Sequence, residues 1–223
     1  MIMQVRWYGH ACFRLEAGGT SVITDPFTPE TSGLRCVTDT ATYVVRSSTD
    51  DDFHCNAAMI GGEPTVLDAP ALVACGPFAV DGLRVTAFSA MESLDKDEPR
   101  LNAMYCCELG GLRVLHMGDL GNPFSREQLG VLQGRVDVVL ALAGGPPTIG
   151  LDDLVAGLAV IAPRVIIPMH YRIPGIRGDF GEVEDLLSRY EADEVTRVEG
   201  SEMDLEPGAL PDLTHLYVLE PSC

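Results

Sequence analysis

Histidine and carboxylate side chains recur in this sequence at the points where short apolar runs end. His10 follows the first such run, Asp25 follows the third, and His170 follows a run that ends near residue 168. These side chains bind divalent metals or exchange protons close to neutral pH. Because strand ends meet at the edge of a sheet, the spacing predicts one site assembled at a common rim.

The stretch from residue 111 to residue 121 concentrates this chemistry. It is typical of a short buried strand, Leu112–Leu115, that leads into a turn carrying His116 and Asp119. Gly118 in this turn would let a metal or a ligand approach the backbone closely. Two plainer readings stay open: an ordinary turn, because Asp and Gly are common turn residues, and a hydrogen-bonded core histidine.

The bulk composition restricts the compartment and the partners. The chain has 223 residues, 46% of them hydrophobic, and a formal net charge of −18. This length suits one large domain or two small ones, and because no repeat or linker divides the chain we predict one domain over residues 1–223. An acidic surface repels phosphates, so neither nucleic acid nor a membrane is an expected partner. No run approaches the roughly 20 apolar residues that span a bilayer, and the first residues lack a signal-peptide layout. Seven cysteines without a Cys-x-x-Cys pair indicate free thiols in the cytoplasm.

Two kinds of pattern divide the chain into a strand-rich part and a mixed part. Before residue 116 we predict short strands, including one over Leu72–Val80 and a hairpin over Ala103–Leu115, which a charged loop over Glu92–Leu101 precedes. Beyond residue 122, helices at 123–132, 151–162 and 181–190 alternate with strands at 136–141, 164–168 and 213–219. This order predicts an α/β fold of two sheets with helices packed outside.

Four segments, in this order, resemble the metallo-β-lactamase superfamily. They also resemble, more narrowly, its branch that includes the ascorbate-6-phosphate lactonases and other zinc-dependent hydrolases. The segments are Trp7-Tyr-Gly-His-Ala-Cys-Phe-Arg-Leu15, Ile23-Thr-Asp-Pro-Phe27, His116-Met-Gly-Asp-Leu-Gly121 and Ile166-Ile-Pro-Met-His-Tyr171. The resemblance implies a four-layer αβ/βα sandwich with a metal site at one edge of the two sheets.

The chain departs from that family at the signature motif His-x-His-x-Asp-His. Aligned without gaps, the motif falls on Ser48, Asp50, Asp52 and Phe53, so that only its aspartate is matched. His54 lies one place beyond the last histidine position, and a shift of one residue would restore that ligand.

The remaining family positions are partly retained. A further histidine position corresponds to Glu92, the bridging aspartate to Asp119 and the final histidine to His170. Nitrogen ligands suit zinc, whereas carboxylates suit Mg²⁺, Mn²⁺ or Ca²⁺ better. We therefore expect either one divalent ion, zinc or manganese, or a metal-free protein. The predicted metal ligands are Asp52, Asp119 and His170, completed from His54, Asp50 and Glu92.

Three further residues are expected to lie next to the metal ligands without binding the metal. His10 and His116 are predicted to orient ligands or to serve the structure alone, and Asp25 to orient ligands or to cap its loop. No catalytic residue other than the ligands is predicted.

Two functions follow from this pattern. The resemblance implies a hydrolase of a small molecule, of the lactone or ester class, that uses metal-activated water at a reduced, mononuclear site. The lost histidines favour the alternative, a catalytically inactive relative that binds a ligand or a partner protein. The resemblance is also compatible with a homo-oligomer.

Overall fold

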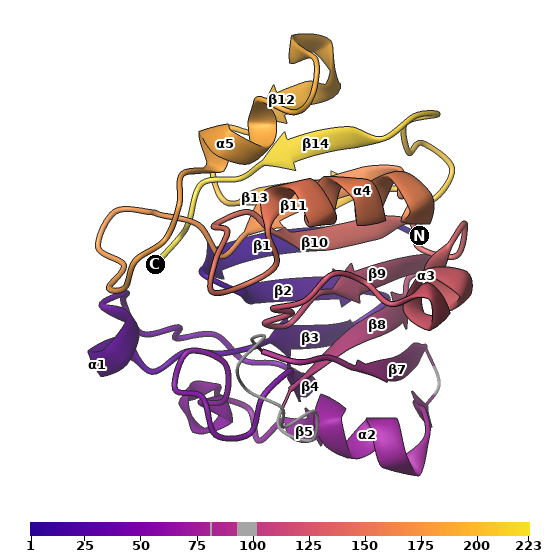
Figure 1. The fold of residues 1–223 in the computed structure, drawn as a ribbon. Coiled ribbons are helices and arrows are strands. Elements are labelled where there is room, and N and C mark those ends of the chain that lie inside the picture. Colours follow the sequence, from indigo (N-terminus) through magenta and orange to yellow (C-terminus); the bar gives the residue numbers. More distant parts are fainter. Residues whose placement is uncertain (81, 93–101) are drawn as a thin grey trace.

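Two β-sheets form the centre of the computed structural model, which describes residues 1–80, 82–92 and 102–223. Figure 1 shows the eight-stranded sheet with helices α3 and α4 in front of it and the six-stranded sheet behind. The predicted arrangement of two sheets with helices outside is confirmed. None of the helices in the described ranges is long and apolar enough to cross a membrane.

The six-stranded sheet is built mainly from the N-terminal part of the chain. Alternation of buried and partly exposed residues along its first strand turns Met3, Val5 and Trp7 toward the other sheet. Its first three strands in chain order are antiparallel, and the next two join them in parallel. In spatial order the strands are β13 (Glu202–Leu205), β1 (Met3–Gly9), β2 (Cys12–Ala17), β3 (Thr20–Thr24), β4 (Tyr43–Arg46) and β5 (Thr65–Asp68).

The eight-stranded sheet is antiparallel in one half and parallel in the other. Its parallel strands β10 and β11 are buried along their whole length, because helices cover the face turned away from the first sheet. In spatial order the strands are β12 (Val195–Arg197), β14 (His215–Val218), β11 (Val165–Met169), β10 (Val138–Leu142), β9 (Leu112–His116), β8 (Ala103–Leu109), β7 (Leu83–Ser89) and β6 (Phe78–Val80).

Five α-helices and two 3₁₀ turns connect these strands within the described ranges. Ser125 caps α3 by accepting the Gln128 backbone N–H, while the Gln128 side chain accepts the Ser125 N–H. The helices are α1 (Pro29–Ser32), α2 (Ala69–Cys75), α3 (Arg126–Leu132), α4 (Leu151–Ile161) and α5 (Val183–Leu187), and the 3₁₀ turns are Ala57–Met59 and Ala192–Glu194.

One predicted strand is wrong. Leu72–Val80 forms the end of helix α2 and, after a break at Gly76, the short strand β6. Pro70 in the first turn and three alanines favour the helix, and a short apolar run carries no period that separates the two structures. Strands β12 and β13 were not predicted. Of the predicted loop over Glu92–Leu101, residues 93–101 lie outside the described ranges.

Two helical glycines give a matched test of this packing. Gly130 in α3 is exposed with open space around it, so Gly130→Ala should raise the free energy of unfolding by about 0.5–1 kcal/mol. Gly157 in α4 is buried, and an added Cβ would overlap the Phe124 ring, so Gly157→Ala should lower it by about 1–3 kcal/mol. Urea unfolding of both variants measures the difference; equal stabilities would contradict the packing of Phe124 on α4.

The carboxyl ends of β1, β3, β4, β9 and β11 lead into one group of loops. Strands β1 and β3 are each antiparallel to β2 and therefore run the same way, and β4 is parallel to β3. Strands β9 and β11 are both parallel to β10. Because carboxyl ends of parallel strands meet at one edge, residues that directly follow these strands can converge there.

Candidate metal centre

Three buried histidines and one aspartate converge at this edge from four separate loops. His10 follows β1, His54 lies in the loop after β4, Asp119 follows β9 and His170 directly follows β11. One ring nitrogen from each histidine lies within 4.8 Å of the other two. Asp119 reaches the same point: its Oδ1 is 3.2 Å from His170 Nε2 and its Oδ2 is 3.7 Å from His54 Nε2. The predicted residues His54, Asp119 and His170 are thus brought together.

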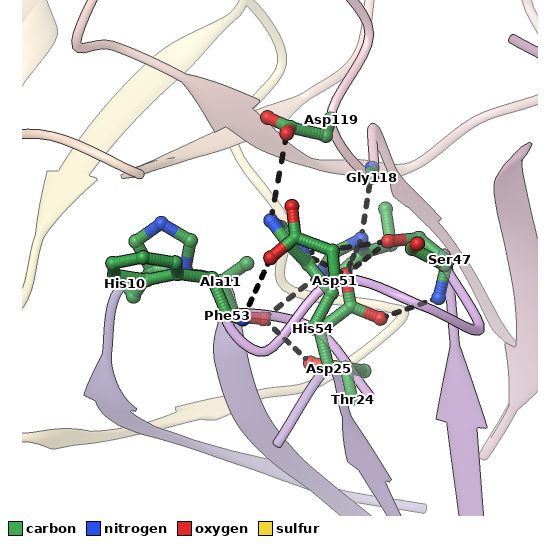
Figure 2. Close-up of polar contacts among 12 residues, drawn as sticks. His10, Ala11, Thr24, Asp25, Ser47, Asp51, Phe53, His54, Gly118 and Asp119 are labelled. Carbon is green, nitrogen blue, oxygen red and sulfur yellow. Dashed lines mark hydrogen bonds and ion pairs between the residues drawn. The ribbon is translucent and has the colours of Figure 1, made fainter. Parts of the chain in front are cut away.

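Asp25 holds His54 in place from behind. Its Oδ2 lies 2.8 Å from His54 Nδ1, so His54 turns its Nε2 toward the cluster, and Figure 2 shows Asp25 and Asp119 on opposite sides of that ring. Ser47 also donates to Asp25, from its backbone N–H at 2.7 Å and from its hydroxyl at 2.5 Å. Tyr105 from the other sheet donates at 3.3 Å. A carboxylate behind a histidine fixes its tautomer and its direction.

The charges of this pair follow from their surroundings. Burial alone would raise the pKa of Asp25, but nearby His116 and His54 and the Ser47 hydrogen bonds hold it below its usual range. Burial likewise lowers the pKa of His54, yet the hydrogen bond to Asp25 and the charge of Asp119 raise it to about 9. Without a cation the pair is therefore an imidazolium beside a carboxylate, and a metal at Nε2 would replace that proton.

His10 lies inside the cluster rather than behind it. Its side chain is 1% exposed, and its ring centroid is 4.2 Å from that of His170 and 5.0 Å from that of His54. Neither ring nitrogen has a hydrogen-bond partner among the described residues. Burial and the neighbouring histidines lower the pKa of His10 well below its ordinary value, so the ring is neutral.

His116 has no ligand role available, because both of its nitrogens are occupied. Its Nε2 donates to the Ala11 carbonyl at 2.8 Å, and its Nδ1 accepts the Gly118 N–H at 3.0 Å. The ring stacks on Tyr105 with centroids 4.9 Å apart. The residue therefore ties the turn after β9 to the turn after β1, next to Asp25.

A second group of possible ligands shares His54 with the three-histidine group. Asp51, His54 and Asp119 each offer one atom within 4.8 Å of the others. Asp51 is partly exposed, and its Oδ1 accepts the Phe53 N–H at 2.7 Å. Asp51 thus stabilises the turn that presents His54 (Figure 2).

The other predicted carboxylate ligands belong to neither group within the described ranges. Asp50 is exposed and accepts from Ser48 at 3.1 Å, whereas Asp52 is exposed and accepts from Thr31 at 3.1 Å. Glu92 is likewise absent from both groups. In the loop after β4 the structure places His54 among the clustered histidines, and the Phe53 ring packs 5.0 Å from that of His10. This placement corresponds to the alignment shifted by one residue.

An aromatic side chain connects the cluster to a cavity. The Phe180 ring lies 5.5 Å from that of His10 and 5.0 Å from that of His170, and it also lines a cavity of about 320 Å³. Gly144, Pro146, Asp179 and Asp185 are among the other lining residues. Sequence reasoning missed Phe180, since no motif marks it. A cavity of about 520 Å³ at Arg6, Arg35 and neighbouring residues includes none of the clustered histidines.

Known proteins are similar to this chain over most of its length. A family model described as the beta-lactamase superfamily domain matches residues 4–170. A UPF0173 metal-dependent hydrolase from Methanoculleus marisnigri is 30% identical over 207 residues, which cover 84% of this chain and 89% of the relative. A UPF0173 protein from Pyrococcus abyssi is 27% identical, covering 76% of this chain and 83% of the relative.

A solved structure agrees with these sequence relatives. A metallo-beta-lactamase superfamily protein from Thermotoga maritima superposes with a TM-score of 0.78 at 28% identity, covering 99% of this chain and 100% of that chain. The predicted fold class is thereby confirmed. The narrower resemblance to the ascorbate-6-phosphate lactonases stays a prediction.

Proposed function

The chain belongs to the metallo-β-lactamase superfamily, and from that premise we propose that it is a metal-dependent hydrolase of an uncharged small ester or lactone. The observation that carries the proposal is the convergence of buried histidine nitrogens with a carboxylate at one edge of the two sheets. The relative from Methanoculleus marisnigri, which is named a metal-dependent hydrolase, supports the same activity class.

The residues at this edge fit a divalent cation. His54 Nε2 and His170 Nδ1 are buried without a hydrogen-bond partner among the described residues, and unpartnered buried nitrogens are rare in folded proteins. His54, His170 and Asp119 would hold the cation, and this mixed set of nitrogen and oxygen donors is typical of catalytic zinc. Bound there, the cation would polarise a carbonyl group and lower the pKa of water.

The remaining side chains position and shield this chemistry. Asp25 fixes the direction of His54, and the rings of Phe53 and Phe180 exclude water from the histidine side of the cluster. The Asp119 side chain is 12% exposed, more than those of His54 and His170, so it lies between the cluster and solvent. In that place the Asp119 oxygen that does not hold the cation can accept the proton that attacking water must lose.

The neighbouring cavity favours an uncharged substrate. Its volume of about 320 Å³ suits a small molecule. Asp179 and Asp185 line it, and the chain carries a net charge of −18, so a phosphorylated or carboxylated substrate would be repelled. Uncharged lactones and esters meet no such barrier.

Hydrolysis by metal-free and reconstituted protein tests the proposal. The full chain, stripped with EDTA and reloaded with Zn²⁺ or Mn²⁺, should hydrolyse uncharged aryl esters or lactones at least about tenfold faster than matched phosphorylated esters. The stripped protein should be inactive. Protein that binds metal stoichiometrically but hydrolyses no compound in this panel would contradict the proposal. That result would favour the alternative, a fold that binds a ligand or a partner without catalysis.

A further inference from the structure

His10 occupies a position that a merely structural histidine would not require. The ring is 1% exposed, its two nitrogens have no hydrogen-bond partner among the described residues, and it faces two other buried histidines. A buried polar ring normally gains a hydrogen-bond partner during folding, because a buried polar atom without a partner loses its hydrogen bonds to water and gains none in return. A cation between the rings would supply that partner.

We propose that His10 is a metal ligand, and that the chain binds a single zinc ion through His10, His54 and His170 with Asp119 beside them. The inference rests on the proposed function, because it concerns the same site. It goes further in assigning the third nitrogen ligand to the turn after β1, and in limiting the site to one ion.

The backbone builds the pair His10 and His170 as one unit. The His10 carbonyl accepts the His170 N–H at 3.1 Å and the Trp7 indole N–H at 3.0 Å. Both histidines have left-handed backbone conformations, with φ of 51° for His10 and 57° for His170. Such conformations are uncommon outside glycine and persist only where the surroundings hold them, often at functional sites. The two rings are thus fixed 4.2 Å apart before any ligand arrives.

His54 limits the site to one ion. It belongs to both groups of possible ligands, but its Nδ1 is bonded to Asp25, which leaves only Nε2 to bind a metal. One imidazole nitrogen binds one cation, so the two groups cannot both be filled through His54. Two ions would require ligands that the groups in the described ranges do not contain.

The three-histidine group suits a zinc ion better than the group of Asp51, His54 and Asp119 does. Its members are all buried, whereas Asp51 in the other group is partly exposed and already accepts the Phe53 N–H. Three nitrogens and a nearby carboxylate select zinc over Mg²⁺, Ca²⁺ or Mn²⁺, which prefer oxygen ligands.

The zinc affinities of two variants, one in each group, show which group of possible ligands binds the metal. Asparagine tolerates the left-handed conformation of residue 10 but is a poor zinc ligand, so His10→Asn should keep the turn. Its zinc affinity, measured by calorimetric titration of the stripped full chain, should fall at least about 100-fold, because loss of an outer partner alone costs about 10–100-fold. Asp51→Asn should stay within about threefold of wild type. His215→Ala, at a partly exposed histidine that bonds Thr196, is the matched control and should change nothing.

A measurement on the wild-type chain makes the test independent of how the variants fold. Proton NMR of the cobalt-loaded protein should show three histidine rings with the large contact shifts that a metal–nitrogen bond transmits, against one in the Asp51 group. Elemental analysis should give one metal per chain. Signals from a single histidine, two metals per chain, or loss of affinity in Asp51→Asn but not in His10→Asn would each overturn the inference. Three shifted histidines without hydrolysis would instead contradict the proposed function and leave this inference standing.

Discussion

Replacing His54 by alanine is expected to weaken zinc binding by at least about 1,000-fold and to remove metal-dependent hydrolysis with it. The reason is that His54 is the member shared by both groups of possible ligands, so no complete group survives its loss. The variant also separates Asp25 from the cluster, since the carboxylate acts on the site through His54 Nδ1. Loss of a ligand and of its orienting partner should together exceed the effect of an outer partner alone, about 10–100-fold.

Calorimetric titration with Zn²⁺ and elemental analysis after dialysis measure the effect of His54→Ala. Thermal unfolding gives a second readout, because a cation that binds only the folded chain raises the melting temperature. Zinc should stabilise wild type and His215→Ala but not His54→Ala. If His54→Ala retained one zinc per chain with wild-type affinity, the metal would lie elsewhere and the assignment of this centre would fail.

Much of the architecture could be predicted from the sequence because strand ends carry local signals. The hairpin with Gly110 and Gly111 at its turn, the buried strand near Val138 and the capped helix after Ser125 follow from neighbouring residues alone. Strands β12 and β13 carry no comparable signal. Each is a short piece whose place depends on a distant partner: β13 on β1, and β12 on β14.

The sequence predicts where the candidate site lies, but not all of the residues that form it. Turns after strands placed Asp119 and His170 at the rim, and both lie there. The loop after β4 could not be aligned from sequence, because three consecutive aspartates offer several registers. Side-chain hydrogen bonds select one register: Asp52 accepts from Thr31, whereas His54 bonds Asp25. The position of His10 depends on its bond to His170, a contact across 160 positions that no local pattern reveals.

Replacing Asp25 by alanine is expected to lower the free energy of unfolding of the metal-free protein by about 3–5 kcal/mol, the cost of breaking a buried ion pair. Asp25 is 0% exposed and accepts from Ser47, His54 and Tyr105. Ser47 follows β4 in the first sheet and Tyr105 lies on β8 in the second, so one carboxylate connects the two sheets. Alanine would remove the acceptor that these buried donors share and leave only longer contacts, from Tyr105 to the Val45 carbonyl at 3.4 Å and between Ser47 and His54 at 3.4 Å.

Urea unfolding in the presence of EDTA isolates this effect from metal binding. Asp25→Asn should destabilise less than Asp25→Ala, since asparagine tolerates the left-handed backbone (φ 38°) and keeps one oxygen acceptor. Its amide N–H₂ would still face donors from Ser47, so it cannot restore wild-type stability. Asp212→Asn, at an exposed aspartate, is the matched control and should stay within about 0.5 kcal/mol of wild type.

Variants of Asp25 should lose both folding stability and zinc affinity, whereas His10→Asn should lose zinc affinity alone. His10 has no hydrogen-bond partner for its ring in the described residues, so His10→Asn should cost the metal-free protein little while weakening zinc binding. Asp25 serves the fold through Ser47 and Tyr105 and the site through His54, so its variants should lose both properties. If Asp25→Ala unfolded at the wild-type urea concentration, the carboxylate would not join the sheets. The direction of His54 would then need another cause.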